Sequence, residues 1–321
     1  MLRRATLLAS LAAMAAASSV LWPPADVSAA SPVPVGFYYG WVTPETQAAI
    51  QGYAALVLGA DSESSGYANQ AAVQQLVASN PSTAFYGYVN LSDGSNPVPA
   101  AELVQEFQEW KALGVRGIFL DLAGSNYGVS RALRVFAVAQ VHLLGMSAAL
   151  NAWDPSDAVG VGLGPGDAYV AEDWYMPGRT PAVQYPNNVS TRDLGALRLL
   201  ASQGVAVWAV TQESVATPSI TADEVARDIA AMRQVVPVAT GFAVGGESYG
   251  AESNAMVPAA DISSALAASG SNGASGPASV QPGAAQSAAP QPTAAMATSR
   301  ISLIPRALVP AFHLVGLGRN G

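Results

Sequence analysis

The stretch GIFLDLAG, residues 117 to 124, places an aspartate at the end of a run of large apolar side chains. Ile118, Phe119 and Leu120 have the character of a strand that is buried on both faces, and small residues follow Asp121. Such strands are typical of parallel sheets covered by helices, where ligands bind at the carboxyl ends of the strands. The stretch therefore predicts a parallel α/β fold with Asp121 at its functional edge.

Similar apolar segments recur along the chain and alternate with longer segments of helical periodicity, as in repeated βα units. We expect eight strands, at residues 35–41, 54–60, 83–90, 116–122, 146–153, 167–175, 205–212 and 240–246. Eight units between residues 34 and 250 fit a closed (β/α)8 TIM barrel. A doubly wound open sheet is the alternative, because alternation does not show whether the sheet closes.

Start and stop signals flank the expected helices. Thr43 precedes a proline suited to a first helical turn, and Thr221 is followed three residues later by a glutamate, as in a capping box. Ser190, followed three residues later by an aspartate, indicates another start. Left-handed C-caps are expected at Gly114, Gly145 and Gly204, which each precede a strand.

The first thirty residues have the pattern of a secretory signal. Arg3 and Arg4 precede an alanine-rich apolar run, and residues 28–30 offer the small side chains that a signal peptidase requires. An uncleaved membrane anchor is the alternative, but the run is weakly hydrophobic and Trp22-Pro23-Pro24 ends it early. We expect residues 1–30 to be a signal peptide and the protein to be secreted or associated with the cell envelope.

Composition divides the remainder into three parts. Residues 31–268 carry the strand and helix pattern and should form a single barrel domain. Residues 269–300, rich in Ala, Ser, Gly, Pro and Gln, predict a disordered linker. The tail, residues 301–321, is apolar but broken by Pro305 and Pro310, so no membrane-spanning segment is expected after the signal.

The charge and the rare residues exclude several classes of function. The formal net charge of −8 makes nucleic acid and anionic lipid poor partners. The chain has no cysteine and two histidines, which leaves only oxygen ligands for a metal, and no calcium-loop spacing appears. His142 is interpreted as a packing residue. The glycine-rich segment 160–166 precedes a strand, so it is interpreted as a loop that covers the mouth, and no cofactor is expected.

In a barrel, the carboxyl ends of all strands face one mouth. The polar residues expected there are Asp61, Asn90, Asp121, Asn151, Glu172, Asp173, Gln212, Glu213 and Glu247. The aromatic residues expected there are Tyr39, Trp41, Tyr88, Trp153, Trp174 and Tyr175, and Arg179 is the main basic residue. Acidic groups beside flat aromatic faces favour a polysaccharide substrate, since rings stack on sugars and paired carboxylates cleave glycosidic bonds.

Asp121 and Glu172 are the candidate catalytic pair. Glycoside hydrolysis needs one protonated and one ionised carboxyl group, and burial can separate their pKa values. Asp173 should point away from Glu172, because strand side chains alternate. A helix cap or an ion pair is the alternative role for each acidic residue, and capping or a solvated loop is the preferred interpretation for Glu213 and Glu247.

Five segments in order resemble the spherulin-4 family and related secreted glycoside hydrolases: FYGYVNLS, EFQEWKALGV, RGIFLDLAGSNYG, SAALNAW and GDAYVAEDWY. The similarity spans about residues 36 to 176 and lies in the order and spacing of the segments. It implies a (β/α)8 endo-glycosidase that acts on galactosamine-containing polysaccharide, with Asp121 essential and Glu172 assisting. Many relatives carry an acidic residue where this chain has Leu122. An acidic mouth would attract a partly deacetylated, cationic amino-sugar polymer.

Residues 246–250, GESYG, match the letters of a serine hydrolase elbow, but that motif needs a helix directly behind Ser248 and a later histidine, and only His313 follows. A non-catalytic glycan-binding barrel and a structural cell-envelope protein remain as alternatives. The separation of the Asp121 and Glu172 carboxyl groups distinguishes the two mechanisms of glycoside hydrolysis. A separation of about 5 to 5.5 Å indicates a retaining glycosidase, and roughly 6.5 to 9.5 Å indicates an inverting one.

Overall fold

The computed structural model describes residues 31–271 except 60, 61, 65, 178–192 and 252. The expected signal peptide and tail, nearly all of the expected linker, and Asp61, Arg179, Ser190 and His313 lie outside the described residues. No helix in the described part of the chain is both long and apolar enough to cross a membrane.

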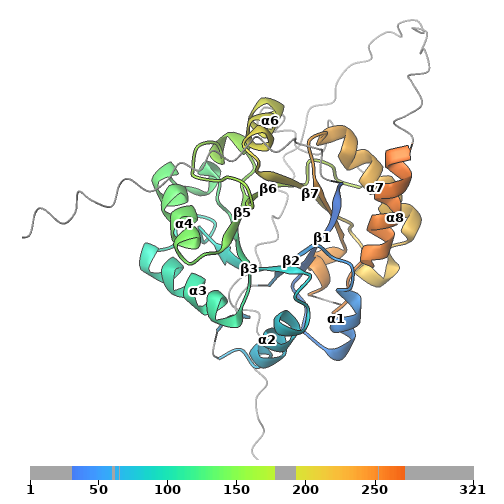
Figure 1. Cartoon of the computed structure of the whole chain (residues 1–321), viewed down its shortest axis with the longest axis horizontal. Helices are drawn as coiled ribbons and strands as arrows, with labels where there is room; N and C mark the ends of the chain where they lie inside the picture. The colour runs from blue at the N-terminus through green and yellow to red at the C-terminus, as the bar shows by residue number, and fades with distance from the viewer. Residues whose placement is uncertain (1–30, 60–61, 65, 178–192, 252, 272–321) are drawn as a thin grey trace, which may run out of the picture. The chain divides into compact units, whose positions relative to one another are not determined.

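Eight parallel strands form a closed barrel in sequence order, surrounded by helices (Figure 1). The strands are β1 (Val33–Tyr38), β2 (Ala55–Leu58), β3 (Ala84–Asn90), β4 (Gly117–Asp121), β5 (Ser147–Asn151), β6 (Ala168–Glu172), β7 (Ala206–Gln212) and β8 (Gly241–Gly245). Strand β1 pairs with β8, with Val33 opposite Gly241, so the sheet closes. The predicted (β/α)8 barrel is confirmed and the open sheet is excluded.

The helices pack around the strands. They are α1 (Pro44–Ala49), α2 (Gln70–Ser79), α3 (Ala100–Leu113), α4 (Arg131–Leu143), α6 (Leu194–Ser202), α7 (Ala222–Val235) and α8 (Ala259–Ser271). Helix α8 extends past residue 268, where we expected the domain to end, and Ser269 is held there by hydrogen bonds from Arg233 and to the Ala265 carbonyl. Between β5 and β6 the chain forms only a 3-10 turn, η2 (Pro155–Asp157), in place of an α-helix.

The glycine-rich segment 160–166 does not cover the mouth, so that prediction was wrong. It leads into β6 at the amino end of the barrel, where the Gly164 amide donates to Asp167 Oδ2 at 2.9 Å. Asp167 Oδ1 also accepts a 2.8 Å hydrogen bond from the amide of Ala148, near the start of β5. His142 lies at the same end, and its side chain is 38% exposed with Nε2 3.0 Å from Asp167 Oδ1, rather than packed in the core.

The predicted caps are largely confirmed. Thr221 and Glu224 form a reciprocal capping box at the start of α7, and Thr43 forms another with Thr46 at the start of α1. Asp193 is the N-cap of α6, and its Oδ1 accepts hydrogen bonds from the amides of Gly195 and Ala196. Left-handed glycines follow α3, α4 and α6, at Gly114, Gly145 and Gly204.

Two apolar layers fix which side chains reach the mouth. An inner core, which includes Phe37, Tyr86, Phe119 and Trp208, fills the barrel. An outer core between strands and helices includes Ile118 and Leu120, the neighbours of Phe119 on β4. This alternation carries Asp121 to the inner side, above a floor of apolar side chains.

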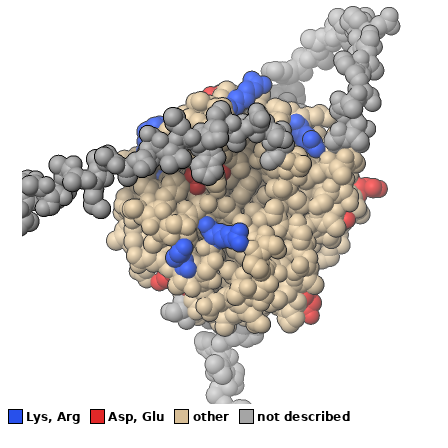
Figure 2. Space-filling model, viewed as in Figure 1, with Lys and Arg blue, Asp and Glu red and all other residues tan. Residues whose placement is uncertain are grey.

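The surface carries little charge. Charged residues make up 11% of the chain, and Figure 2 shows that the face seen in Figure 1 is mostly uncharged, with scattered basic and acidic groups. Specific electrostatic recognition must therefore come from residues concentrated within a site.

Candidate active site

Three neighbouring strands bring Asp121, Asn151 and Glu172 together. The three residues end β4, β5 and β6, which are adjacent in the barrel. Asn151 Nδ2 donates to Asp121 Oδ1 at 2.9 Å and to Glu172 Oε2 at 2.6 Å. Because one nitrogen contacts both, the two acceptor oxygens lie no more than 5.5 Å apart, the sum of the two bond lengths.

Two tyrosines donate hydrogen bonds to the other oxygen of each carboxyl group. Tyr88 donates to Asp121 Oδ2 at 2.5 Å, and Tyr249 donates to Glu172 Oε1 at 3.1 Å. Tyr39 packs edge-on against both rings, with centroids 5.4 Å away in each case. Burial, and then the neighbouring carboxylates, raise the pKa values of Tyr88 and Tyr249 well above normal, so both hydroxyls remain donors.

The two carboxyl groups differ in acidity. Burial raises the pKa of Glu172 to about 8, and the negative charges of Asp173 and Asp121 add to this effect. Burial also raises the pKa of Asp121, but hydrogen bonds from Tyr88 and Asn151 oppose the shift. At neutral pH the proton of this coupled pair therefore resides mainly on Glu172, and Asp121 is the carboxylate.

The backbone turns sharply directly after each carboxylate. Leu122 has φ 49° and Asp173 has φ 54°, a left-handed conformation that is uncommon outside glycine. The regular alternation of side chains along β6 therefore ends at Glu172. The charge of Asp173 raises the pKa of Glu172, an effect that was not expected from a side chain pointing the opposite way. Leu122 packs against the outer core, so it lies away from the carboxylate pair. Asp and Asn tolerate a left-handed position better than leucine does.

The other predicted polar residues lie in different surroundings. Asn90 Oδ1 is 2.9 Å from the Tyr88 hydroxyl, next to the carboxylate pair. Gln212 donates to the Gly246 carbonyl at 3.0 Å, which ties β7 to the end of β8. Glu247 is exposed in the 3-10 turn η5 (Glu247–Gly250).

The predicted aromatic residues also separate into groups. Tyr39 and Tyr88 line the inner core, whereas Trp174 is only 4% exposed within the outer core, where it cannot stack on a ligand. Trp153 packs edge-on against Tyr127 with centroids 6.0 Å apart. Trp41 is exposed and stacks at an angle on Tyr67.

Tyr249 contacts the carboxylate pair, and the sequence did not predict it there. It lies within GESYG, and the structure places no α-helix directly behind Ser248, since the next one, α8, begins at Ala259. Ser248 and Tyr249 both have left-handed φ angles, 54° and 47°, which turn the tyrosine back into the barrel. Gly245 leaves room for it, because a Cβ there would lie 2.5 Å from the Tyr249 ring. The Gly-Gly pair that ends β8 was the available signal.

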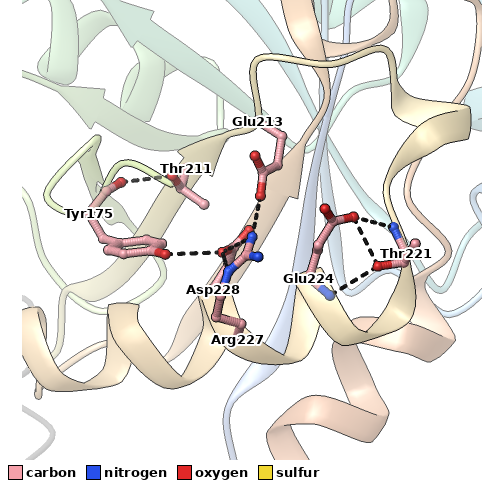
Figure 3. Close-up of polar contacts among 7 residues, drawn as sticks. All are labelled: Tyr175, Thr211, Glu213, Thr221, Glu224, Arg227 and Asp228. Carbon is pink, nitrogen blue, oxygen red and sulfur yellow. Dashed lines mark hydrogen bonds and ion pairs between the residues drawn. The ribbon is translucent and has the colours of Figure 1, made fainter. Parts of the chain in front are cut away.

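A second acidic cluster lies beside β7 (Figure 3). Glu213 is buried, so it is not in a solvated loop, and it accepts a 2.6 Å bond from Arg227 Nη2. The same nitrogen donates to Asp228 Oδ1 at 3.0 Å, and the Tyr175 hydroxyl donates to that oxygen at 3.3 Å. Burial raises the pKa of Asp228 to about 7, and Glu213 adds to the shift. The cluster joins α7 to the end of β7 and to the segment after β6.

Asp228→Asn should make stability less dependent on pH. A carboxyl group whose folded pKa is raised stabilises the fold when protonated, and this contribution falls between its unfolded pKa and about pH 7. The amide does not titrate, so the difference in Tm between pH 5 and pH 8 should shrink by on the order of 3 °C. Thermal unfolding of Asp223→Asn, exposed on the same helix, is the control. An unchanged pH dependence in Asp228→Asn would contradict the prediction.

A buried ion pair holds the loop that follows Asp121. Arg134 Nη2 lies 2.6 Å from Asp157 Oδ1, with side chains 5% and 10% exposed. Arg134 Nη1 also donates to the carbonyls of Ala123 and Val129, at 3.2 and 2.7 Å. Asp157 Oδ2 accepts from the Ser125 amide at 2.7 Å. This network fixes the path of the chain directly behind the carboxylate.

Arg134→Met should lower the free energy of unfolding by about 3 kcal/mol or more, because it leaves the Asp157 charge buried and unpaired. Urea unfolding measures the change. Arg134→Met combined with Asp157→Asn should recover part of the loss, and Arg198→Met, on an exposed part of α6, is the control. A loss in the single variant no greater than in the control would contradict the prediction.

Comparisons with known proteins find similar folds. No family model matches the sequence, and no curated protein matches it. The glycoside hydrolase domain of PelA from Pseudomonas aeruginosa has a TM-score of 0.48 and 18% identity, over 66% of this chain and 94% of that chain. A GH18 chitinase from Pseudoalteromonas aurantia has a TM-score of 0.47 and 9% identity, over 73% of this chain and 99% of that chain. A 3-keto-L-gulonate-6-phosphate decarboxylase from Vibrio cholerae has a TM-score of 0.45 and 12% identity, over 74% of this chain and 98% of that chain. Such distant similarity concerns the barrel and identifies no activity, and membership of the spherulin-4 family stays a prediction.

Proposed function

We propose that this chain is a secreted glycoside hydrolase that cleaves an amino-sugar polysaccharide with retention of configuration. The observation that carries the proposal is the single Asn151 nitrogen that contacts both Asp121 and Glu172. Retaining enzymes place their carboxyl groups about 5 to 5.5 Å apart, whereas inverting enzymes need roughly 6.5 to 9.5 Å to admit a water molecule. The upper bound of 5.5 Å on the two acceptor oxygens fits the first class.

The difference in acidity supports a separate role for each carboxyl group. Glu172, with a pKa raised to about 8, carries the proton that the leaving oxygen requires. Asp121 attacks the anomeric carbon, the glycosidic bond breaks as Glu172 protonates the departing oxygen, and a covalent glycosyl ester forms on Asp121. Glu172, now ionised, takes a proton from water, whose oxygen attacks the anomeric carbon and releases Asp121.

Hydrogen bonds from neighbouring side chains hold the two carboxyl groups in position. Tyr88 and Asn151 both donate to Asp121, which stabilises it as a carboxylate before attack and as a leaving group afterwards. Tyr249 holds Glu172 from the other side. The apolar floor beneath them excludes water from the far side of the pair.

The charges at the mouth support an amino-sugar polymer as the substrate. Asp121 and Asp173 place negative charge beside the protonated Glu172, so a sugar that carries an ammonium group is favoured over an anionic one. A partly deacetylated galactosamine polymer, the substrate that the resemblance implies, has this charge. The other predicted contacts, Asn90, Trp153, Gln212 and Glu247, remain proposals for binding neighbouring units.

The test is hydrolysis of amino-sugar polymers by the purified chain without residues 1–30. New reducing ends should appear with a galactosamine polymer, and NMR of the first product should show the configuration of the bond that was cleaved. An inverted product would refute the retaining mechanism. Saturable binding without new reducing ends would instead favour a non-catalytic glycan-binding barrel.

A further inference from the structure

Trp41 is exposed to an extent that packing does not explain. Its side chain is 45% exposed, and it is the only aromatic residue among the large exposed apolar side chains in the described ranges. Its ring stacks at an angle of 50° on Tyr67, with centroids 5.6 Å apart. Tyr67 belongs to the segment between β2 and α2, so two separate connections at the mouth end combine to form one aromatic surface.

The backbone around Trp41 is fixed by side chains from three segments. The Trp41 amide donates to Asn254 Oδ1 at 2.6 Å, and its carbonyl accepts from the Tyr38 hydroxyl at 2.7 Å. The buried Asn69 side chain bonds both the amide and the carbonyl of Val42, at 2.7 and 2.9 Å. An exposed indole on so constrained a backbone is held ready to bind, with little conformational entropy left to lose.

The turn before Trp41 is equally restricted. A Cβ at Gly40 would lie 2.7 Å from the Gly250 carbonyl oxygen and 2.8 Å from the Tyr38 ring, so only glycine fits. Tyr39, on the other side of this turn, packs against Tyr88 and Tyr249 beside the carboxylate pair. The turn therefore separates a residue of the proposed active site from a residue on the outer rim.

A hollow of about 380 Å³ lies between α1 and α2 and starts at Val42, the residue that follows Trp41. Its lining comprises Val42, Thr43, Pro44, Gln47, Ala72 and Gln75. None of these six residues ionises, and they supply two amides, one hydroxyl and several apolar groups. Such a lining suits a neutral ring that carries hydroxyl or acetamido groups, in contrast to the acidic centre of the mouth.

We infer that Trp41, Tyr67 and this hollow form an outer subsite that holds one uncharged, N-acetylated sugar unit of the polysaccharide. The inference rests on the proposed function, because the chain held at the rim is the one cleaved between Asp121 and Glu172. The sugar's apolar face lies on the indole, and its polar groups meet Gln47 and Gln75. The enzyme thereby selects a partly acetylated chain, with a cationic unit at the centre and a neutral unit at the rim.

The experiment compares Trp41→Ala with wild type on galactosamine oligosaccharides of increasing length, in fully deacetylated and partly N-acetylated series. In the wild type, KM should fall as the chain becomes long enough to reach the rim, and more so in the acetylated series. Trp41→Ala should lose this advantage, with KM for long acetylated chains about tenfold higher, and Trp41→Phe should restore part of it. Leu143→Ala, another exposed apolar side chain, is the control.

Direct binding separates this inference from the proposed function. Calorimetric titration with fully N-acetylated galactosamine oligosaccharides should show binding that Trp41→Ala weakens, even if the wild type cleaved no polymer. The same KM profile in Trp41→Ala and wild type, or an equal loss at every chain length, would overturn the outer subsite. Equal calorimetric affinity in the two proteins would overturn it as well.

Discussion

Asp121→Asn should lower kcat for polysaccharide hydrolysis by at least about a thousandfold, because the amide cannot form the covalent ester. The geometry around the position should survive, since an asparagine oxygen can still accept from Tyr88 or from Asn151. The expected loss is therefore one of chemistry rather than of folding. Release of reducing ends measures activity, and thermal unfolding should show a Tm close to that of the wild type.

Two comparisons make the Asp121 result specific. Asp223→Asn makes the same chemical change on the exposed surface of α7 and should leave activity intact. Asp121→Ala with added azide should regain turnover and give a glycosyl azide of inverted configuration, because azide then attacks where the carboxylate stood. An Asp121→Asn enzyme with more than about a tenth of wild-type activity would remove Asp121 from the nucleophile role.

Glu172→Gln should lower kcat for the polymer by about 10² to 10⁴, because no group can then protonate the leaving oxygen. The loss should be smaller for an aryl glycoside, whose leaving group needs little protonation. In the wild type, kcat/KM should fall as the pH rises above about 8, where Glu172 loses its proton. That alkaline decline should be absent in Glu172→Gln.

The pH profile is the decisive measurement for Glu172. Glu109→Gln, a change of the same kind on the surface of α3, should keep both the activity and the alkaline decline. If Glu172→Gln retained the decline, the acid would be another group. If polymer and aryl glycoside lost activity equally, Glu172 would have a structural role rather than donate a proton.

The barrel was predictable because its signals are local. A strand such as residues 117–121 is apolar on both faces, and cap residues such as Thr221 and Gly114 act within one helical turn. The ends of such strands also indicated Asp121 and Glu172, since parallel strands present their carboxyl ends at the same edge. The sequence pattern did not reveal that no α-helix lies between β5 and β6. The segment 160–166 was therefore wrongly expected to cover the mouth.

The environment of each side chain was not predictable in this way. Trp174 and Trp153 follow strands as Trp41 does, yet one is in the outer core, one packs on Tyr127 and one is exposed on the rim. Which of these occurs depends on backbone turns after the strand, such as the left-handed φ at Asp173, and on partners far away in the sequence. Tyr249 was missed for the same reason, because two consecutive left-handed residues direct it into the barrel.

The sequence by itself determined the eight strands, most of the helices between them with their starts and ends, and the two strands that carry the carboxylates, since these depend on short-range periodicity and capping. Only the tertiary structure decided that one Asn151 nitrogen bridges Asp121 and Glu172, and that Tyr249 completes the set. The physical reason is that acidity and separation depend on burial and contacts between strands distant in the sequence, and barrel closure alone brings those strands together.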